Sequence, residues 1–255
     1  RYAMRTIALL LGLLFSAPAI SEVIPVEPFS KGFFGTYQTM TFLEKQDKAE
    51  LTVVVIMGYP GNFGLKPGDI WVKNQTAWLM LELIKRSKIT ANIVVVDSPF
   101  SLLTFGSRAT GDHLERIESV VKFYREKFKV PVWLFGHSDG SISVSEYLND
   151  SDRTRKSVVG AILSGGRNET RITEDWKIPV LVMHHENDGC EWTTFNNAKR
   201  YFTKIQKANS APVEFASIKG GYHGPGDACG TGYHMYQGAF DEALDSIEAF
   251  IYRNK

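Results

Sequence analysis

The chain has 255 residues, of which 44% are hydrophobic and 22% are charged, and its formal net charge at pH 7 is +1. This composition is that of an ordinary folded protein, and it excludes a disordered or fibrous one. The near-zero charge lacks the basic excess that nucleic-acid binders usually carry, so no nucleic-acid partner is expected. Two cysteines are too few for a disulfide-built scaffold or a four-cysteine zinc site.

The first residues of the chain predict a secretory signal peptide. Arg1 and Arg5 precede the apolar run 7–15, and the small-x-small sequence Ala-Pro-Ala follows at residues 17–19. A basic start, a short apolar centre and small residues at the end are typical of a cleavable signal. The apolar run is shorter than the roughly 20 residues that a membrane-spanning helix needs.

The predicted signal divides the chain into two parts. Residues 1–19 form the signal, in which residues 1–3 lie upstream of the expected start at Met4, and residues 20–255 form a single mature domain without a membrane span. We therefore expect a secreted or periplasmic protein.

Export also bears on the two cysteines, Cys190 and Cys229. Secreted and periplasmic proteins meet an oxidising compartment, in which disulfides form and persist. Pairing of the two thiols is therefore the default expectation.

After a proline-containing leader over 20–35, the chain alternates between strand and helix patterns. Residues 36–43 and 51–57 flank a polar stretch and predict an antiparallel hairpin. Further strands are predicted in chain order at 93–96, 130–135, 158–163, 180–183 and 213–218. All but the last of these lack polar alternation, which is typical of strands buried on both faces of a parallel sheet. The last one alternates, as an edge strand does.

Helical patterns lie between these strands. The clearest begins at Asp112, where Glu115 completes a capping-box pattern, and apolar residues recur on one face from Leu114 to Phe128. The others are predicted at 76–85, 141–148, 194–206 and 238–252. Strands that alternate with helices imply right-handed crossovers and a doubly wound α/β sheet.

The segment Gly136-His137-Ser138-Asp139-Gly140 matches the G-x-S-x-G pattern. It follows the predicted strand 130–135 directly and opens the helical stretch that begins at Ser141. A strand-to-helix turn of this kind exposes its serine at the carboxyl edge of the sheet, and the two glycines avoid steric clashes. Ser138 is therefore the candidate nucleophile, and His137 is interpreted as a filler of the turn.

With this motif and this order of strands, the chain resembles the α/β-hydrolases from about Thr36 onward. The resemblance implies a doubly wound, mostly parallel sheet of about seven to eight strands flanked by helices. It also implies a nucleophile, an acid and a histidine in that order along the chain. Only a short segment separates Ser164 from Pro179, where many family members insert a helical cap. Little or no cap domain, and hence an open site, is expected.

The resemblance implies that the acid lies in the loop after the strand 180–183. Asp188 occupies the matching position in the sequence His-His-Glu-Asn-Asp-Gly, and Glu186 is the alternative. The carboxylate would fix the tautomer of the catalytic histidine and stabilise its imidazolium. The histidine and glutamate spacing here matches no common ligand pattern, so no metal site is expected.

Two histidines compete for the role of the base. His223 directly follows the strand 213–218, and His234 directly precedes the last predicted helix. A subset of secreted α/β-hydrolases resembles this chain in having one cysteine just after the acid and another just before the histidine. Cys190 and Cys229 stand at those positions, which favours His234, with His223 as the alternative. A bridge between the two cysteines would then tie the acid loop to the histidine loop.

The resemblance also implies where the backbone donors of an oxyanion hole lie. One donor comes from the loop after the strand 51–57, and the other from the residue after the nucleophile. These are the N–H groups of Tyr59 and Asp139, since Pro60 has no N–H.

These residues together predict a secreted serine hydrolase that cleaves carboxylic esters by an acyl-enzyme mechanism, without a metal or an organic cofactor. Its partner is expected to be a small-molecule or acylated substrate. A serine peptidase or acyltransferase with the same triad, or a catalytically silent binding protein with the same fold, remain alternatives. Residues that either line the substrate pocket or pack in the core or a loop are Phe100, Leu102, Leu103, Phe105 and Trp192.

Overall fold

The computed structural model describes residues 20–27, 38–98, 106–150 and 157–255. The strands are β1 (Ile20–Val26), β2 (Thr39–Lys45), β3 (Leu51–Ile56), β4 (Ala91–Val96), β5 (Val132–His137), β6 (Gly160–Ser164), β7 (Val180–His185) and β8 (Val213–Ile218). The helices are α1 (Gln75–Lys85), α2 (Gly111–Phe128), α3 (Gly140–Leu148), α5 (Phe195–Ala208) and α6 (Phe240–Asn254). Two 3-10 turns are η1 (Gly106–Ala109) and η2 (Gly232–Met235).

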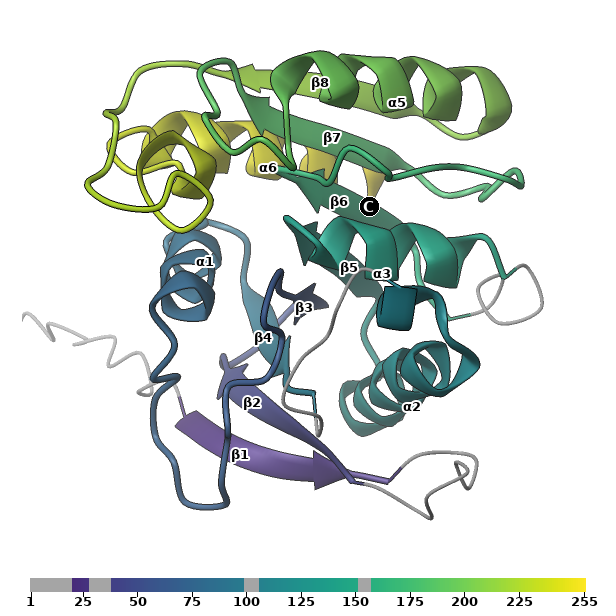
Figure 1. Cartoon of the computed structure of the whole chain (residues 1–255). Coiled ribbons are helices and arrows are strands. Elements are labelled where there is room, and N and C mark those ends of the chain that lie inside the picture. The colour runs from purple at the N-terminus through teal and green to yellow at the C-terminus, as the bar shows by residue number, and fades with distance from the viewer. Residues whose placement is uncertain (1–19, 28–37, 99–105, 151–156) are drawn as a thin grey trace, which may run out of the picture.

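The eight strands form one sheet in the order β1-β2-β4-β3-β5-β6-β7-β8 (Figure 1). The strands β3 to β8 run parallel to one another. At one edge, β2 pairs antiparallel with β4, and β1 pairs antiparallel with β2. The predicted doubly wound, mostly parallel sheet is therefore confirmed. The strand β8 lies at the other edge and is only half-buried, as its alternating sequence predicts.

Helices cover both faces of the sheet. Figure 1 shows α1 and α6 on one side and α2, α3 and α5 on the other. Along β3, Val53 and Val55 pack into the core under α1 and α6, whereas Val54 packs into the core on the opposite side, because successive strand residues point to opposite faces. Because both faces of such a strand are buried, it is apolar at every position, which explains the unbroken apolar runs of the sequence.

The predicted hairpin over 36–43 and 51–57 is wrong. The strand β2 pairs with β1 and β4, and β3 pairs with β4 and β5. Every residue of β3 is buried. A strand with two buried faces belongs in the middle of the sheet, between two parallel neighbours, and not in a hairpin at the edge.

The leader over 20–35 contains a strand that its sequence pattern did not predict. Residues 20–26 form β1, which pairs with β2 along its whole length. Pro25 is tolerated because β1 is an edge strand, in which the backbone N–H groups on the outer side have no neighbouring strand to bond to.

The predicted helices all exist, with ends that differ by one or two residues. The predicted capping box of Asp112 and Glu115 is wrong, because α2 begins one residue earlier, with Thr110 as its N-cap. Asp112 lies in the first helical turn instead, where the helix dipole favours a negative charge. The signal predicted at 1–19 lies outside the described residues.

Two further features concern the surroundings of the site. The described segment 165–179 between β6 and β7 contains no helix or strand, so no cap is inserted at this place. Within the described ranges, none of the helices has the length and apolar character needed to cross a membrane.

Candidate active site

Ser138 lies in the tight turn between β5 and α3, with a φ of 56°. The glycines on either side allow this turn. A Cβ on Gly136 would lie 2.6 Å from the carbonyl oxygen of Gly140, and a Cβ on Gly140 would lie 1.9 Å from that of Ile56. Both contacts are closer than real atoms allow, so β3, β5 and α3 approach one another this closely only with glycine at the two positions. The strained left-handed conformation of the serine is typical of a nucleophile elbow.

The structure brings the predicted acid and the favoured histidine together. His234 Nδ1 lies 2.8 Å from Asp188 Oδ2, and both side chains are almost completely buried. Because a carboxylate only accepts hydrogen bonds, Nδ1 carries the proton and Nε2 is left as an acceptor. His234 Nε2 has no hydrogen-bond partner among the described residues. His234 and Ser138 line the same pocket.

The two alternative residues lie elsewhere. His223 is exposed, does not line the pocket, and has its ring 6.4 Å from that of Tyr233. Glu186 is also exposed and accepts a hydrogen bond from the hydroxyl of Ser217 over 2.7 Å, with Lys219 Nζ 3.5 Å away. Neither residue contacts the Asp188–His234 pair, so the geometry favours the pair.

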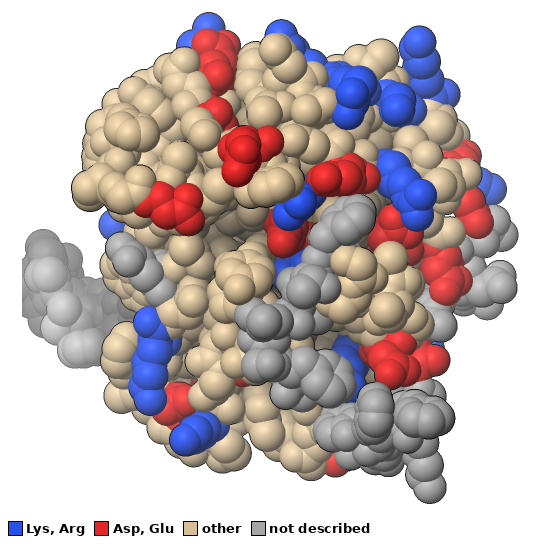
Figure 2. Space-filling model, in the orientation of Figure 1, with Lys and Arg blue, Asp and Glu red and all other residues tan. Residues whose placement is uncertain are grey.

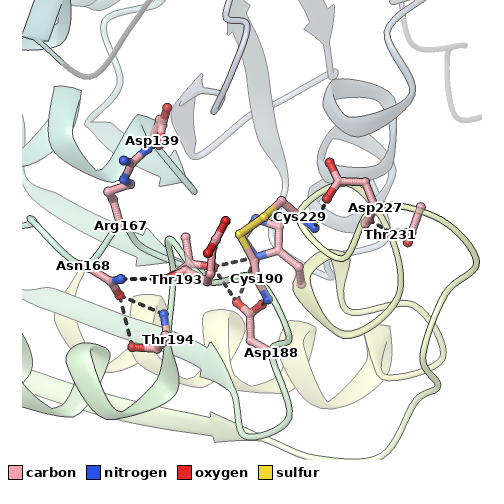
Figure 3. The surroundings of a disulfide bond; sticks show 12 residues. Asp139, Arg167, Asn168, Asp188, Cys190, Thr193, Thr194, Asp227, Cys229 and Thr231 are labelled. Atoms are coloured by element: carbon pink, nitrogen blue, oxygen red, sulfur yellow. Dashed lines mark hydrogen bonds and ion pairs between the residues drawn. A yellow bond between two sulfur atoms is a disulfide. The ribbon is translucent and has the colours of Figure 1, made fainter.

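The Asp188 carboxylate has three further partners, of which Thr193 and Cys190 are labelled in Figure 3. Oδ2 accepts from the Thr193 hydroxyl over 3.0 Å and lies 3.1 Å from His184 Nε2, while Oδ1 accepts from the Cys190 N–H over 2.9 Å. His184 Nε2 also donates to the carbonyl oxygen of Thr193 over 2.6 Å. Sequence reasoning missed His184 and Thr193 as partners of the acid. The available signal for His184 was its position at the end of a wholly apolar strand.

These partners change the acidity of Asp188. Burial raises the pKa of its carboxyl, but the neighbouring imidazoles of His234 and His184 outweigh this effect and hold the pKa well below its ordinary value. The carboxyl is therefore ionised throughout the neutral range.

We expect Asp188 to make the protein lose stability in acid. A carboxyl with a depressed folded pKa favours the folded state above its unfolded pKa of about 3.9, and this contribution disappears as the pH falls through the folded pKa. Urea unfolding midpoints between pH 6 and pH 2.5 should therefore fall more steeply below about pH 4 for the wild type than for Asp188→Asn. Equal slopes would contradict the depressed pKa.

Cys190 and Cys229 form the predicted disulfide, which lies beside Asp188 and Thr193 in Figure 3. The two cysteines are 39 residues apart, and closing a loop of this length stabilises a fold by roughly 3–4 kcal/mol in chain-entropy models. Both cysteines line the pocket. The bridge therefore tethers the acid loop to the segment that leads into η2 and His234.

The loop after β3 packs directly on the turn that holds Ser138. A Cβ on Gly58 would lie 2.7 Å from the Cβ of Ser138 and 3.3 Å from the backbone nitrogen of Asp139. Tyr59 follows Gly58 and lines the pocket together with Asp139. Neither of the two predicted donors, the N–H groups of Tyr59 and Asp139, donates a backbone hydrogen bond within the described part of the chain. The sequence predicted the two donors but not the contact between Gly58 and Ser138.

Asp97, at the end of β4, fixes the loop after β3. Its carboxylate accepts from the N–H groups of Phe63 over 2.5 Å and Leu65 over 2.8 Å. The amide of Asn62 donates to the carbonyl oxygen of Ser98 over 2.6 Å. Sequence reasoning missed this role, although a lone aspartate at the end of an apolar strand marks it.

His137 lies beneath His234. It is buried, its ring centroid is 4.8 Å from that of His234, and its Nδ1 is 3.1 Å from the hydroxyl oxygen of Ser164. Burial lowers the pKa of His137 well below its usual range, and the neighbouring His234 adds to this effect. A neutral imidazole in this place packs against the candidate base His234.

The pocket over these groups has a volume of about 640 Å³. Tyr59 and Trp192 line it with largely exposed rings, and the guanidinium of Arg167 lies 4.8 Å from the Trp192 ring. Of the two alternatives for Trp192, the structure shows the pocket lining. The other candidates, Phe100, Leu102, Leu103 and Phe105, lie outside the described residues.

Charges around the site are mixed. Arg167 forms an ion pair with Asp139 over 2.8 Å, and Figure 2 shows charged side chains of both signs scattered over this face of the molecule. In the part of the chain that the structure describes, no three histidine, cysteine, aspartate or glutamate side chains are grouped so that they could hold a metal ion.

Solved structures of hydrolases share this architecture. An α/β serine hydrolase without lid from Xanthomonas campestris superposes with a TM-score of 0.58 at 11% identity, covering 93% of this chain and 96% of that one. Carboxyl esterase 2 from the fungus Tuber melanosporum superposes with a TM-score of 0.63 at 14% identity, covering 95% of this chain and 90% of that one. An esterase from Pyrococcus furiosus superposes with a TM-score of 0.62 at 10% identity, covering 92% of this chain and 93% of that one. No family model and no curated protein sequence matches the chain. The chain has the α/β-hydrolase fold.

Proposed function

We propose that this chain with the α/β-hydrolase fold is a serine hydrolase that cleaves carboxylic esters through an acyl-enzyme. The observation that carries the proposal is the hydrogen bond between Asp188 and His234 in a pocket that also exposes Ser138 on a glycine-flanked turn. Solved structures of the same fold that are described as esterases support the choice of ester over amide.

In the first step, the Ser138 hydroxyl attacks the acyl carbonyl carbon while His234 Nε2 accepts the hydroxyl proton. The tetrahedral intermediate collapses, the carbon–oxygen bond to the alcohol breaks, and His234 returns the proton to the leaving oxygen. A water molecule then repeats the sequence on the acyl-enzyme and releases the acid. Asp188 keeps the imidazole in the tautomer that leaves Nε2 unprotonated and stabilises the imidazolium in between.

The negative charge of the tetrahedral intermediate falls on the former carbonyl oxygen. The N–H groups of Tyr59 and Asp139 are the proposed donors to it, and a donor of this kind contributes about 3–4 kcal/mol to the transition state. The contact of Gly58 with Ser138 supports this assignment, because it brings the two loops into van der Waals distance at the nucleophile.

The proposed substrate is a small ester or an exposed acyl group on a larger molecule. The pocket has exposed aromatic rings at its edge, and the described segment between β6 and β7 inserts no cap over it. A disulfide beside the site supports work in a secreted or periplasmic compartment, in which such bonds persist. Removal of a signal over residues 1–19, leaving one domain over 20–255, belongs to the same proposal.

A fluorophosphonate probe tests the proposal. We expect the label on the peptide that contains Ser138, and p-nitrophenyl acetate turnover that the probe abolishes. Turnover of a matched anilide in preference to the ester would indicate a peptidase, and product diversion to an added alcohol would indicate an acyltransferase. A protein that neither labels nor turns over an ester, an anilide or a thioester would be a binding protein.

A further inference from the structure

A buried arginine lies directly behind the proposed oxyanion hole. Arg108, in η1, exposes none of its surface. Its Nη1 donates to the carbonyl oxygen of Met57 over 2.9 Å and to the hydroxyl oxygen of Ser143 over 3.0 Å. Its Nε and Nη2 have no hydrogen-bond partner among the described residues. No carboxylate among the described residues forms an ion pair with Arg108, and burying a guanidinium in this way costs several kcal/mol, so the fold retains this group against a considerable penalty.

The two partners of Arg108 belong to the two elements that carry the proposed oxyanion donors. Met57 directly follows β3 and lies two residues before Tyr59. Ser143 lies in the first turn of α3, which begins directly after Asp139. One guanidinium nitrogen therefore links the loop of the first donor to the helix of the second.

A third residue fixes the Ser143 hydroxyl in place. His113 Nε2 lies 2.9 Å from the Ser143 oxygen. Burial lowers the pKa of His113 to about 3, helped by the charges of Arg108 and Arg116, so its imidazole is neutral at pH 7. Arg108 donates to the Ser143 oxygen, and a hydroxyl has capacity for a second hydrogen bond, here with His113 Nε2. The Ser143 hydroxyl is thus held between Arg108 Nη1 and His113 Nε2.

The charge of Arg108 also acts on the site. Burial lowers the pKa of its guanidinium to about 10, which leaves it protonated at neutral pH. The nearby carboxylate of Asp139 raises this pKa, and its ion-pair partner Arg167 lowers it by a smaller amount. A cation in the interior, where the effective dielectric constant is low, favours a negative charge that develops nearby.

We infer that Arg108 is a positioning residue of the oxyanion hole, which holds the N–H groups of Tyr59 and Asp139 at a fixed spacing through Met57 and Ser143. This inference rests on the proposed ester hydrolysis. The donors contact the substrate oxygen most strongly once it carries charge, so loss of Arg108 should weaken binding of the transition state and leave binding of the ester nearly unchanged.

The test compares Arg108→Gln with the wild type on p-nitrophenyl acetate, with active sites counted by fluorophosphonate titration. We expect kcat to fall at least about tenfold and KM to stay within about twofold. Inhibition by a trifluoromethyl ketone, which forms a tetrahedral oxyanion on the serine, should weaken by the same factor as kcat. Arg108→Lys, which keeps the charge and one donor nitrogen, should restore part of the loss.

A matched control uses an arginine on the surface of the same region. Arg171 is exposed and pairs with Glu146 of α3 over 2.8 Å, and Arg171→Gln should leave kcat and inhibition unchanged. Ser143→Ala provides the measurement if Arg108→Gln does not fold, and it should lower kcat about threefold to tenfold, the value of about one hydrogen bond.

The outcomes separate two kinds of failure. A wild type that turns over esters, together with a folded Arg108→Gln or Ser143→Ala protein that keeps the wild-type kcat and inhibitor affinity, overturns the role of Arg108 and leaves the hydrolase intact. A loss confined to KM overturns it as well. A wild type that is inert to the probe and to every ester overturns both conclusions.

Discussion

His234→Ala should lower kcat for a p-nitrophenyl ester by about 10⁴-fold or more, close to the loss caused by Ser138→Ala. The reason is that His234 Nδ1 is bound to the buried Asp188 carboxylate, which leaves Nε2 as the acceptor for the serine proton. Without this base the hydroxyl is a weak nucleophile at neutral pH. The double variant should be hardly less active than either single one, because the two residues act as a unit.

His223→Ala is the matched control for this prediction. His223 has an exposed side chain and lies outside the pocket, so we expect kcat and KM within about twofold of the wild type, the range for a surface group that makes no contact with the reacting atoms. Steady-state kinetics and the rate of fluorophosphonate labelling measure both variants. An inactive His223→Ala protein beside an active His234→Ala protein would reverse the assignment of the base.

Gly140→Ala should destabilise the fold by about 4 kcal/mol or more, or prevent folding altogether. Its Cβ would lie 1.9 Å from the carbonyl oxygen of Ile56 in β3. The backbone fixes the position of the Cβ, and the oxygen is itself a backbone atom, so no side-chain rotation relieves the overlap. The helix α3 would have to move away from the sheet, and the close-packed core under it resists such a shift. Urea unfolding measures the loss, and probe labelling shows whether the turn at Ser138 survives.

Gly111→Ala is the control for this effect. Gly111 opens α2, and a Cβ there would meet nothing within 4 Å. Alanine should leave stability unchanged or raise it by up to about 1 kcal/mol, because it restricts the unfolded chain. If both glycine variants unfold at the wild-type urea midpoint, the contact between α3 and β3 is looser than the structure indicates.

Local patterns were sufficient for the parallel sheet and for the turn at Ser138. A strand buried on both faces must be apolar throughout, and a turn this tight must have glycine at fixed positions, so Gly136 and Gly140 mark it in the sequence. The pairing of β2 with β4 could not be read in the same way. Which strands lie side by side depends on the burial of every strand in the molecule. The wholly buried β3 lies in the centre of the sheet, so β2 and β3, although consecutive in the chain, do not pair.

The supporting groups of the site were hidden for a similar reason. These groups bond to partners that lie apart from them in the chain. Arg108 is 51 residues from Met57, Asp97 is 34 residues from Phe63, and His184 is 9 residues from Thr193. A buried arginine and an exposed one look alike in a sequence, because burial depends on which elements cover the residue. Only the packed structure shows that Arg108 is enclosed.

The sequence by itself determined the α/β class, the candidate nucleophile Ser138 and the short list of partners, because these depend on residues close together in the chain. The tertiary structure decided which histidine meets the acid. Asp188 and His234 are 46 residues apart, and they meet because parallel strands end at one edge of the sheet and a disulfide holds the two loops there. His223, although nearer to the acid in the chain, is left facing solvent.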